Sequence, residues 1–170
     1  MSSDRFSGKV IVGVCIAFNT VFLGLATAGL SIGLIVAYLI WRDWKWQADG
    51  KRVLYPYVLT LGGFILHFAE EYFTDFYVAF PRLIGDSWSA RSFLIFNLVW
   101  FAVFALSVVG LWYERPVAYL VVIFFALAGG IANGAAHILI SLWQGRYFPG
   151  TATAPLMLAG GLILFQRLRA

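Results

Sequence analysis

The sequence predicts an all-α fold: one polytopic bundle of five transmembrane helices that takes up residues 1–170 as a single integral membrane domain. The first observation is composition. Hydrophobic residues make up 62% of the 170 residues and charged residues 12%, and the mean hydropathy is +0.86, which is typical of a chain whose main solvent is lipid. The second is the recurrence of long apolar stretches separated by short connections, which leaves no room for a soluble domain.

Five stretches are long enough, or nearly so, to cross a hydrocarbon core of about 30 Å at about 1.5 Å per residue. The first is too long for the core of a signal peptide, so we expect it to remain in the protein as one helix. Its Gly24, Gly29 and Gly33 also allow a bend or close helix packing. The expected spans are approximately 10–40, 54–80, 92–113, 117–143 and 152–166.

Charge argues against a nucleic-acid partner and suggests an orientation. The net charge of +4 comes from basic residues scattered through connections and termini, not gathered in one stripe. Five spans place seven of the 12 Lys and Arg on the C-terminal side and five on the N-terminal side, so the positive-inside rule favours an external N-terminus and a cytoplasmic C-terminus. The single cysteine, Cys15, excludes an internal disulfide and a cysteine-based zinc site.

A cluster of ionisable residues interrupts the second apolar stretch. His67, Glu70 and Glu71 stand where a charged side chain costs roughly 2.5 to 3.5 kcal/mol at a helix centre. Both glutamates can share a helix face with the imidazole, because they follow it by three and four residues. Something must therefore compensate these carboxylates or keep them neutral.

Polar residues of two other spans fall at a similar depth. Each distance is measured from the middle of the residue's own span toward the N-terminal side of the membrane. It is roughly 5 Å for each glutamate, roughly 10 Å for His137 and roughly 8 Å for Asn97. Asn133 lies one turn deeper than His137. Helices with such residues cannot expose them to lipid, so we expect an intramembrane polar pocket that opens toward the N-terminal side. Asp75, roughly 12 Å from the middle, would lie near its opening.

The fourth span also carries a signal for close packing. Asn133 and His137 are one turn apart and form a polar stripe. Gly129, Gly130 and Gly134 allow another helix to approach nearby.

Three short motifs resemble those of a known family. HFAEE at 67–71, NGAAH at 133–137 and YFPG at 147–150 are similar to the H-x-x-E-E, N-x-x-x-H and x-x-P-G signatures of the HXXEE family of bacterial integral membrane proteins. The order of the motifs matches, and the resemblance runs from the second span to the start of the fifth. The resemblance implies a bacterial cytoplasmic membrane protein of an uncharacterised family that is suspected to contain enzymes. Its motifs contain the same polar residues that lie at a similar depth in the membrane.

A metal site is the first hypothesis for this pocket. His67, Glu70, Glu71 and His137 are suitable ligands for zinc or non-haem iron, and a cation would neutralise the buried acids. Asn133 is better suited to support the ligands than to bind the metal. An open coordination position would make the protein a metal-dependent hydrolase or oxidoreductase acting on a lipid-like or other apolar small molecule.

Three other interpretations remain open. A metal-free isomerase would use a glutamate as proton donor and His67 or His137 as acceptor, by analogy with membrane sterol isomerases of the emopamil-binding type, with Trp100 stabilising a carbocation. The same buried groups also suit a proton or cation pathway in a channel or transporter. Alternatively, they only pair across helices to hold the bundle together.

The expected substrate-binding residues surround the predicted catalytic group. Tyr147 lies at the rim, where a phenol can reach a substrate headgroup or assist a ligand, while Pro149 and Gly150 make the turn into the fifth helix. The expected partners are the lipid bilayer and an apolar small molecule, and a homo-oligomer is compatible with the sequence. The substrate-binding set is Tyr147, Asn97, Trp100 and Asp75.

Overall fold

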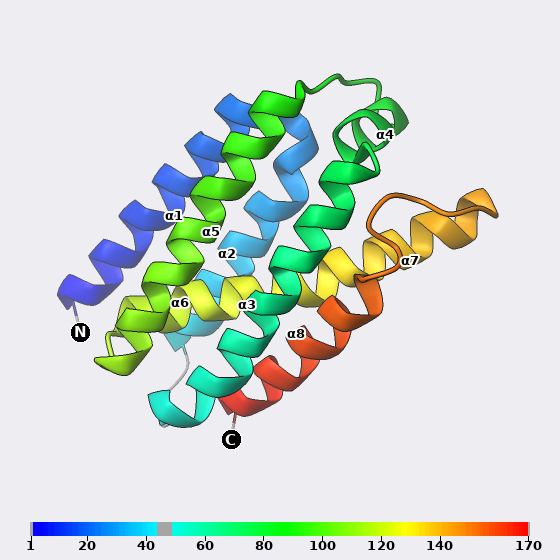
Figure 1. Ribbon diagram of the computed structural model, residues 1–170. Coiled ribbons are helices and arrows are strands. Elements are labelled where there is room, and N and C mark those ends of the chain that lie inside the picture. Colours follow the sequence, from blue (N-terminus) through cyan, green and yellow to red (C-terminus); the bar gives the residue numbers. More distant parts are fainter. Residues whose placement is uncertain (1, 44–48, 170) are drawn as a thin grey trace.

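The computed structural model describes residues 2–43 and 49–169, which form a helical bundle without a strand in those residues (Figure 1). The all-α prediction is confirmed. Among the described residues, four helical runs are long and apolar enough to cross a membrane: Phe6–Leu23, Gly50–Phe73, Ala90–Trp112 and Pro116–Gln144. The elements are α1 (Ser2–Leu23), a 3-10 turn η1 (Gly24–Thr27), α2 (Ala28–Asp43), α3 (Gly50–Phe73), α4 (Phe76–Leu83), α5 (Ala90–Trp112), α6 (Pro116–Phe124), a π-helical segment η2 (Phe125–Ala132), α7 (Asn133–Gln144) and α8 (Ala154–Arg169).

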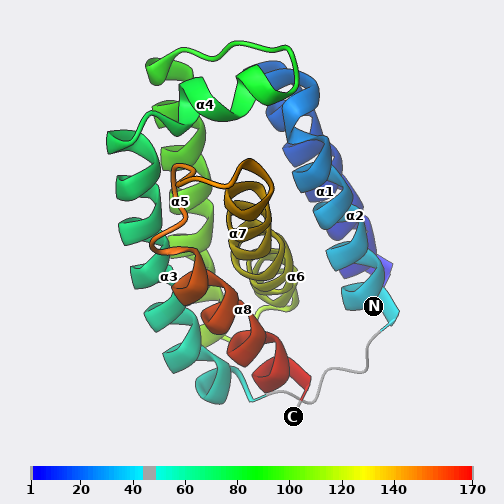
Figure 2. The same cartoon turned by 90° about the vertical axis from the view of Figure 1, so that its right-hand side faces the viewer.

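The single helix expected over residues 10–40 is two antiparallel helices. The chain turns at Gly24, whose φ of 62° favours glycine, and α2 then packs back along α1. The prediction of one helix was wrong because both arms are apolar, so hydropathy gave no sign of the reversal. Both termini therefore lie at the end of the bundle opposite α4 (Figure 1 and Figure 2), whereas five alternating spans would have placed them at opposite ends.

The N-terminal hairpin is fixed along one side of the bundle. Trp41 of α2 is buried and donates from Nε1 to the carbonyl oxygen of Pro116, 2.8 Å away. Gly33 lies so close to η2 that an added Cβ would be 3.0 Å from the Cβ of Ala128. The hairpin thus packs on both α6 and η2.

The span expected over 54–80 is divided into two helices. Asp49 caps the start of α3 by accepting a hydrogen bond from the Lys51 amide at 2.9 Å. The helix ends at Phe73, because Asp75 adopts a left-handed conformation with φ of 62° and starts α4 in a new direction. The short α4 lies across one end of the bundle (Figure 2), and α5 agrees with the expected span over 92–113.

The span expected over 117–143 is one continuous run through α6, η2 and α7. Its middle is π-helical, a geometry often found beside functional sites, and Asn133 follows directly after it. Close packing on α8 is confirmed: a Cβ on Gly130 would lie 2.6 Å from the Cα of Gly161, and one on Gly134 would lie 2.7 Å from the carbonyl oxygen of Ala154. This contact places the loop of residues 145–153 beside α3 and α7.

Candidate metal centre

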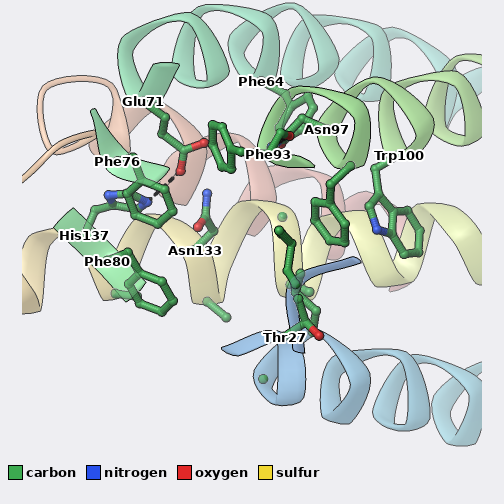
Figure 3. Close-up of a pocket in the computed structure, with 18 of the residues that line it drawn as sticks. Thr27, Phe64, Glu71, Phe76, Phe80, Phe93, Asn97, Trp100, Asn133 and His137 are labelled. Carbon is green, nitrogen blue, oxygen red and sulfur yellow. Dashed lines mark hydrogen bonds and ion pairs between the residues drawn. The ribbon is translucent and has the colours of Figure 1, made fainter. Parts of the chain in front are cut away.

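Three buried side chains converge between α3 and α7. Glu71 Oε1 lies 3.4 Å from His67 Nε2 on its own helix and 3.0 Å from His137 Nε2 on α7. The exposed fractions of His67, Glu71 and His137 are 0%, 5% and 2%, and Figure 3 shows Glu71 directed toward His137. In the part of the chain that the structure describes, these residues form a group that could hold a metal ion, with ligand atoms within 4.8 Å of one another.

The two imidazoles are held by their other ring nitrogen. His137 Nδ1 lies 2.6 Å from the carbonyl oxygen of Pro149, which only accepts, so this nitrogen carries hydrogen. His67 Nδ1 lies 2.7 Å from the hydroxyl of Thr153. That hydroxyl donates its own hydrogen to Glu70 Oε2, 2.5 Å away, so His67 Nδ1 must donate as well. Both Nε2 atoms therefore face the shared carboxylate, with the supporting hydrogen bonds that usually orient metal-binding histidines.

Gly150 lies between the two imidazoles. Its φ is 87°, and an added Cβ would be 2.5 Å from both Cε1 and Nδ1 of His137 and 3.1 Å from Cε1 of His67. Any other residue would strain the backbone and displace a ring. The turn expected at Pro149 and Gly150 is present. The close contact of Gly150 with both imidazole rings was not predicted from the sequence.

Glu70 lies outside the group of three, although we expected it to be a ligand. Its Oε1 accepts from the Tyr147 hydroxyl at 2.5 Å and from the Ala152 amide at 2.9 Å. Its Oε2 accepts from the amide and the hydroxyl of Thr153 at 2.8 and 2.5 Å. Adjacent residues of an α-helix point about 100° apart, so only one of the two glutamates can face His137. Glu70 instead fixes the loop that supports the imidazoles.

Tyr147 is part of this loop attachment and does not line the pocket. Its side chain is 52% exposed, and its hydroxyl donates to Glu70. Partial desolvation, followed by this hydrogen bond, raises the pKa of the Tyr147 phenol, so it stays a neutral donor at physiological pH. Tyr147 was expected at the rim of the pocket, but it lies outside the pocket lining and its hydroxyl is engaged by protein.

Asn133 contacts the centre at His67. Its Nδ2 lies 2.8 Å from His67 Nε2, and the side chain is half-buried at the edge of the pocket. This hydrogen bond occupies the lone pair of the ring nitrogen that does not carry hydrogen. A metal ion bound by His67 would therefore have to take the place of the Asn133 amide at this nitrogen. The structure thus brings His67, Glu71, Asn133 and His137 together from two helices.

A pocket of about 270 Å³ extends from this polar centre into an aromatic interior. Glu71, Asn133 and His137 lie at one end, and Asn97 and Trp100 lie further along (Figure 3). The two further residues were expected to bind substrate, and both line the pocket. Their nitrogen atoms donate to protein: Asn97 Nδ2 to a backbone carbonyl at 3.0 Å, and Trp100 Nε1 to a buried asparagine at 3.1 Å.

Asp75 does not belong to the pocket. It is exposed at the start of α4 and accepts a hydrogen bond from Tyr77 at 2.7 Å. The depth argument assumed that α3 continues through Asp75, but the left-handed turn there directs the side chain away. Thr153, in contrast, was not expected at the site, although its hydroxyl lies against His67 Nδ1 and orients the ring. The only sign of it in the sequence is its position just before the last helix.

The hydrogen-bonding balance of the centre requires a shared proton or a metal ion. A neutral imidazole with hydrogen on Nδ1 presents a lone pair at Nε2, and a carboxylate oxygen also presents only lone pairs. Two acceptors cannot remain 3.0 Å apart in a buried site unless a proton or a metal ion lies between them. Ligands about 2.0–2.2 Å from a tetrahedral zinc ion are separated by about 3.4 Å. The distance from Glu71 to His67 equals this separation, whereas the 3.0 Å between Glu71 and His137 is also the length of a hydrogen bond.

Comparison with known proteins gives a family but no function. No curated protein and no solved structure matches the chain. The family model described as a protein of unknown function with HXXEE motif matches residues 58–164, a range that contains His67, Glu71 and His137. This match covers more than half of the chain, which therefore belongs to the HXXEE family.

Proposed function

We propose that the protein is a membrane-embedded, metal-dependent enzyme that holds zinc or iron(II) through His67, Glu71 and His137 and acts on an apolar small molecule. The observation that supports this most directly is the convergence of three oriented ligand atoms at the polar end of an apolar pocket. Two histidines and one carboxylate bind the metal in several zinc hydrolases and in non-haem iron oxygenases.

The proposed metal would be reached from the pocket. Three protein ligands leave a coordination position for water or substrate, and two of them, Glu71 and His137, line the pocket wall. Zinc in such a position lowers the pKa of bound water to about 7 and polarises a carbonyl, which gives a hydrolase. Iron would instead bind oxygen, which gives an oxidoreductase, so the identity of the metal decides the reaction class.

Metal-free acid–base catalysis is the second candidate. Glu71 and His137 are 3.0 Å apart, which is within proton-transfer distance. Asn133 meanwhile occupies the lone pair of His67 with a hydrogen bond. This arrangement would suit an isomerase acting on an apolar substrate in the same pocket.

Metal analysis of purified protein tests the proposal. We expect about one zinc or iron per chain in the wild type, and a loss of bound metal in Glu71→Gln and His137→Ala. The matched control is Glu70→Gln, which removes the same charge one residue away and should keep the metal, because Glu70 contacts the loop. Wild-type protein that takes up no stoichiometric zinc or iron, even when reconstituted without oxygen, would exclude the metalloenzyme.

Ion flux in proteoliposomes distinguishes an enzyme from a transport protein. The metal proposal expects no proton or cation flux above that of empty liposomes. A flux that Glu71→Gln abolishes and Glu70→Gln preserves would favour a channel or transporter and would contradict catalysis as the function.

We also infer that both termini face the cytoplasm and that α4 lies at the opposite face. With the hairpin in place, eight described basic residues lie at the end that carries the termini, against three at the α4 end. The three are Arg82, Arg91 and Arg146. The positive-inside rule therefore supports an orientation different from that expected for five spans. The eight are Arg5, Lys9, Arg42, Lys51, Arg52, Arg115, Arg167 and Arg169.

A further inference from the structure

The aromatic pocket is closed at one end of the bundle and open at the side. Phe76 and Phe80 of α4 and Trp88 of the following loop cover the end, and α4 lies across the bundle there (Figure 2). The residues of the pocket lining that are exposed are small: Gly29 at the start of α2, Ala132 at the end of η2 and Ala136 in α7. Access is therefore from the side, between α2 and α7.

This opening lies at the depth of the hydrocarbon core. The run Pro116–Gln144 is 29 residues long, so its middle is near residue 130. Ala132 and Ala136 then lie about 3 and 9 Å from the middle along the helix, within the half-thickness of about 15 Å of a bilayer core. Molecules that reach this opening come from lipid, not from water.

The walls of the pocket favour an apolar chain. Phe93, Phe96, Phe104 and Phe124 line it beyond the polar centre together with Trp100. Asn97 Nδ2 and Trp100 Nε1 both donate to protein acceptors. At about 270 Å³, the pocket is slightly smaller than typical small-molecule sites of about 300–1,000 Å³. It suits one chain and excludes a phospholipid with two.

Recognition must come from the polar end. An apolar chain gains little when it leaves lipid for an equally apolar pocket, because lipid tails already surround it with apolar contacts. The groups that can distinguish a ligand from surrounding lipid are Glu71, Asn133 and His137. Trp88, at the closed end of the bundle, adds a buried Nε1 donor that has no hydrogen-bond partner among the described residues.

We propose that the substrate is a single-chain amphiphile with one oxygen-containing polar group, which enters from the bilayer between α2 and α7. Its polar group is directed to Glu71 and His137, and its chain lies among the phenylalanines of α5 and α6. The orientation of the polar group rests on the function proposed above. The lateral access and the chain site rest on the pocket alone.

Photo-crosslinking with a defined probe tests this inference. The probe is a twelve-carbon alcohol with a diazirine near its methyl end, added to protein in liposomes and mapped by mass spectrometry. We expect labelling at Phe96 and Trp100, which line the pocket, in addition to background labelling at lipid-exposed Leu98 of the same helix. An excess of dodecanol should reduce labelling at Phe96 and Trp100, whereas dodecane should not.

Two variants obstruct the opening from opposite sides, namely Gly29→Phe on α2 and Ala132→Phe on η2. A Cβ at Gly29 meets nothing within 4 Å, so the larger side chain can be accommodated without a clash at that atom. Both variants should lose the labelling at Phe96 and Trp100 and keep it at Leu98. Gly62→Phe is the matched control, because Gly62 is exposed, has the same free space and lies outside the pocket lining.

The outcomes separate this inference from the proposed function. Labelling confined to lipid-exposed positions would overturn the chain site, and labelling that persists in both obstructed variants would overturn the lateral route. Metal content is measured on the same samples. Probe uptake by protein that contains no metal would contradict the metalloenzyme but support the chain site. Metal binding by protein that takes up no probe would contradict the chain site but support the metalloenzyme.

Discussion

Glu70 and Glu71 are neighbours in the sequence, but their carboxylates bind to different parts of the molecule. Glu71 lies between the Nε2 atoms of two histidines, and Glu70 accepts hydrogen bonds from the loop that precedes α8. The loop in turn holds the Nδ1 atoms of the same histidines. The two acids thus act on one centre from two directions, one as a candidate ligand and the other as an anchor of the supporting loop.

Replacement of Glu70 should loosen the loop without emptying the centre. Glu70→Gln weakens hydrogen bonds that are worth about 1.5–3 kcal/mol each when the acceptor is charged. We expect faster tryptic cleavage after Arg146, which is exposed at the start of the loop, measured by mass spectrometry in detergent. Glu114→Gln, in the exposed turn between α5 and α6, is the control. An unchanged cleavage rate would argue against anchoring by Glu70.

Two glycines with similar backbones should respond differently to alanine. Gly145 and Gly150 have φ of 63° and 87°, and strain of this kind costs about 1–3 kcal/mol. Only at Gly150 would the Cβ also meet the imidazole of His137, at 2.5 Å. Gly145→Ala should lower thermal stability and keep the metal, whereas Gly150→Ala should lower metal affinity as well. Equal metal affinities would show that the ring position does not depend on Gly150.

The hydroxyl of Thr153 should tune the affinity of the centre. Thr153→Val removes the acceptor for His67 Nδ1, and loss of such a supporting hydrogen bond typically costs about 10–100-fold in metal affinity. Thr153→Ser keeps the hydroxyl and should bind metal like the wild type. Competition titration with a chromogenic chelator gives both values, and equal affinities of the valine and serine variants would contradict the prediction.

Metal removal should destabilise the protein. A ligand present at 100 times its dissociation constant stabilises the folded state by about 2.7 kcal/mol. Removal of the proposed metal would also take a cation away from Glu71 and the imidazoles. We expect chelator treatment to lower the midpoint of thermal unfolding, followed by near-ultraviolet circular dichroism, and zinc or iron(II) to restore it. The midpoint of Glu71→Gln should not respond to either addition.

The inferred orientation can be read from cysteine labelling. In a Cys15→Ala background, Ser87→Cys reports the loop after α4 and Glu114→Cys reports the turn at the opposite end. A membrane-impermeant maleimide should label Ser87→Cys in intact cells and Glu114→Cys only after permeabilisation. The reverse pattern would place both termini outside.

The class of the protein and most of its polar centre follow from the sequence alone. Apolar stretches predict helices because backbone groups in lipid must be paired within the segment. Charge in such a helix is costly, which singles out His67, Glu70, Glu71 and His137 before any contact is known. Helical spacing then gives approximate depth and direction, enough to group these residues with Asn133.

The tertiary structure decided what helical spacing leaves open. Both glutamates lie near the face of His67, and only the position of α7 and the loop makes Glu71 the shared partner of the histidines and Glu70 the anchor. The hairpin at Gly24, and with it the common end for both termini, depends on one backbone angle within an apolar stretch. The roles of Gly150 and Thr153 depend on contacts between segments far apart in the chain. Such contacts leave no periodic signal, because they are set by how the helices pack and not by the residues along any one of them.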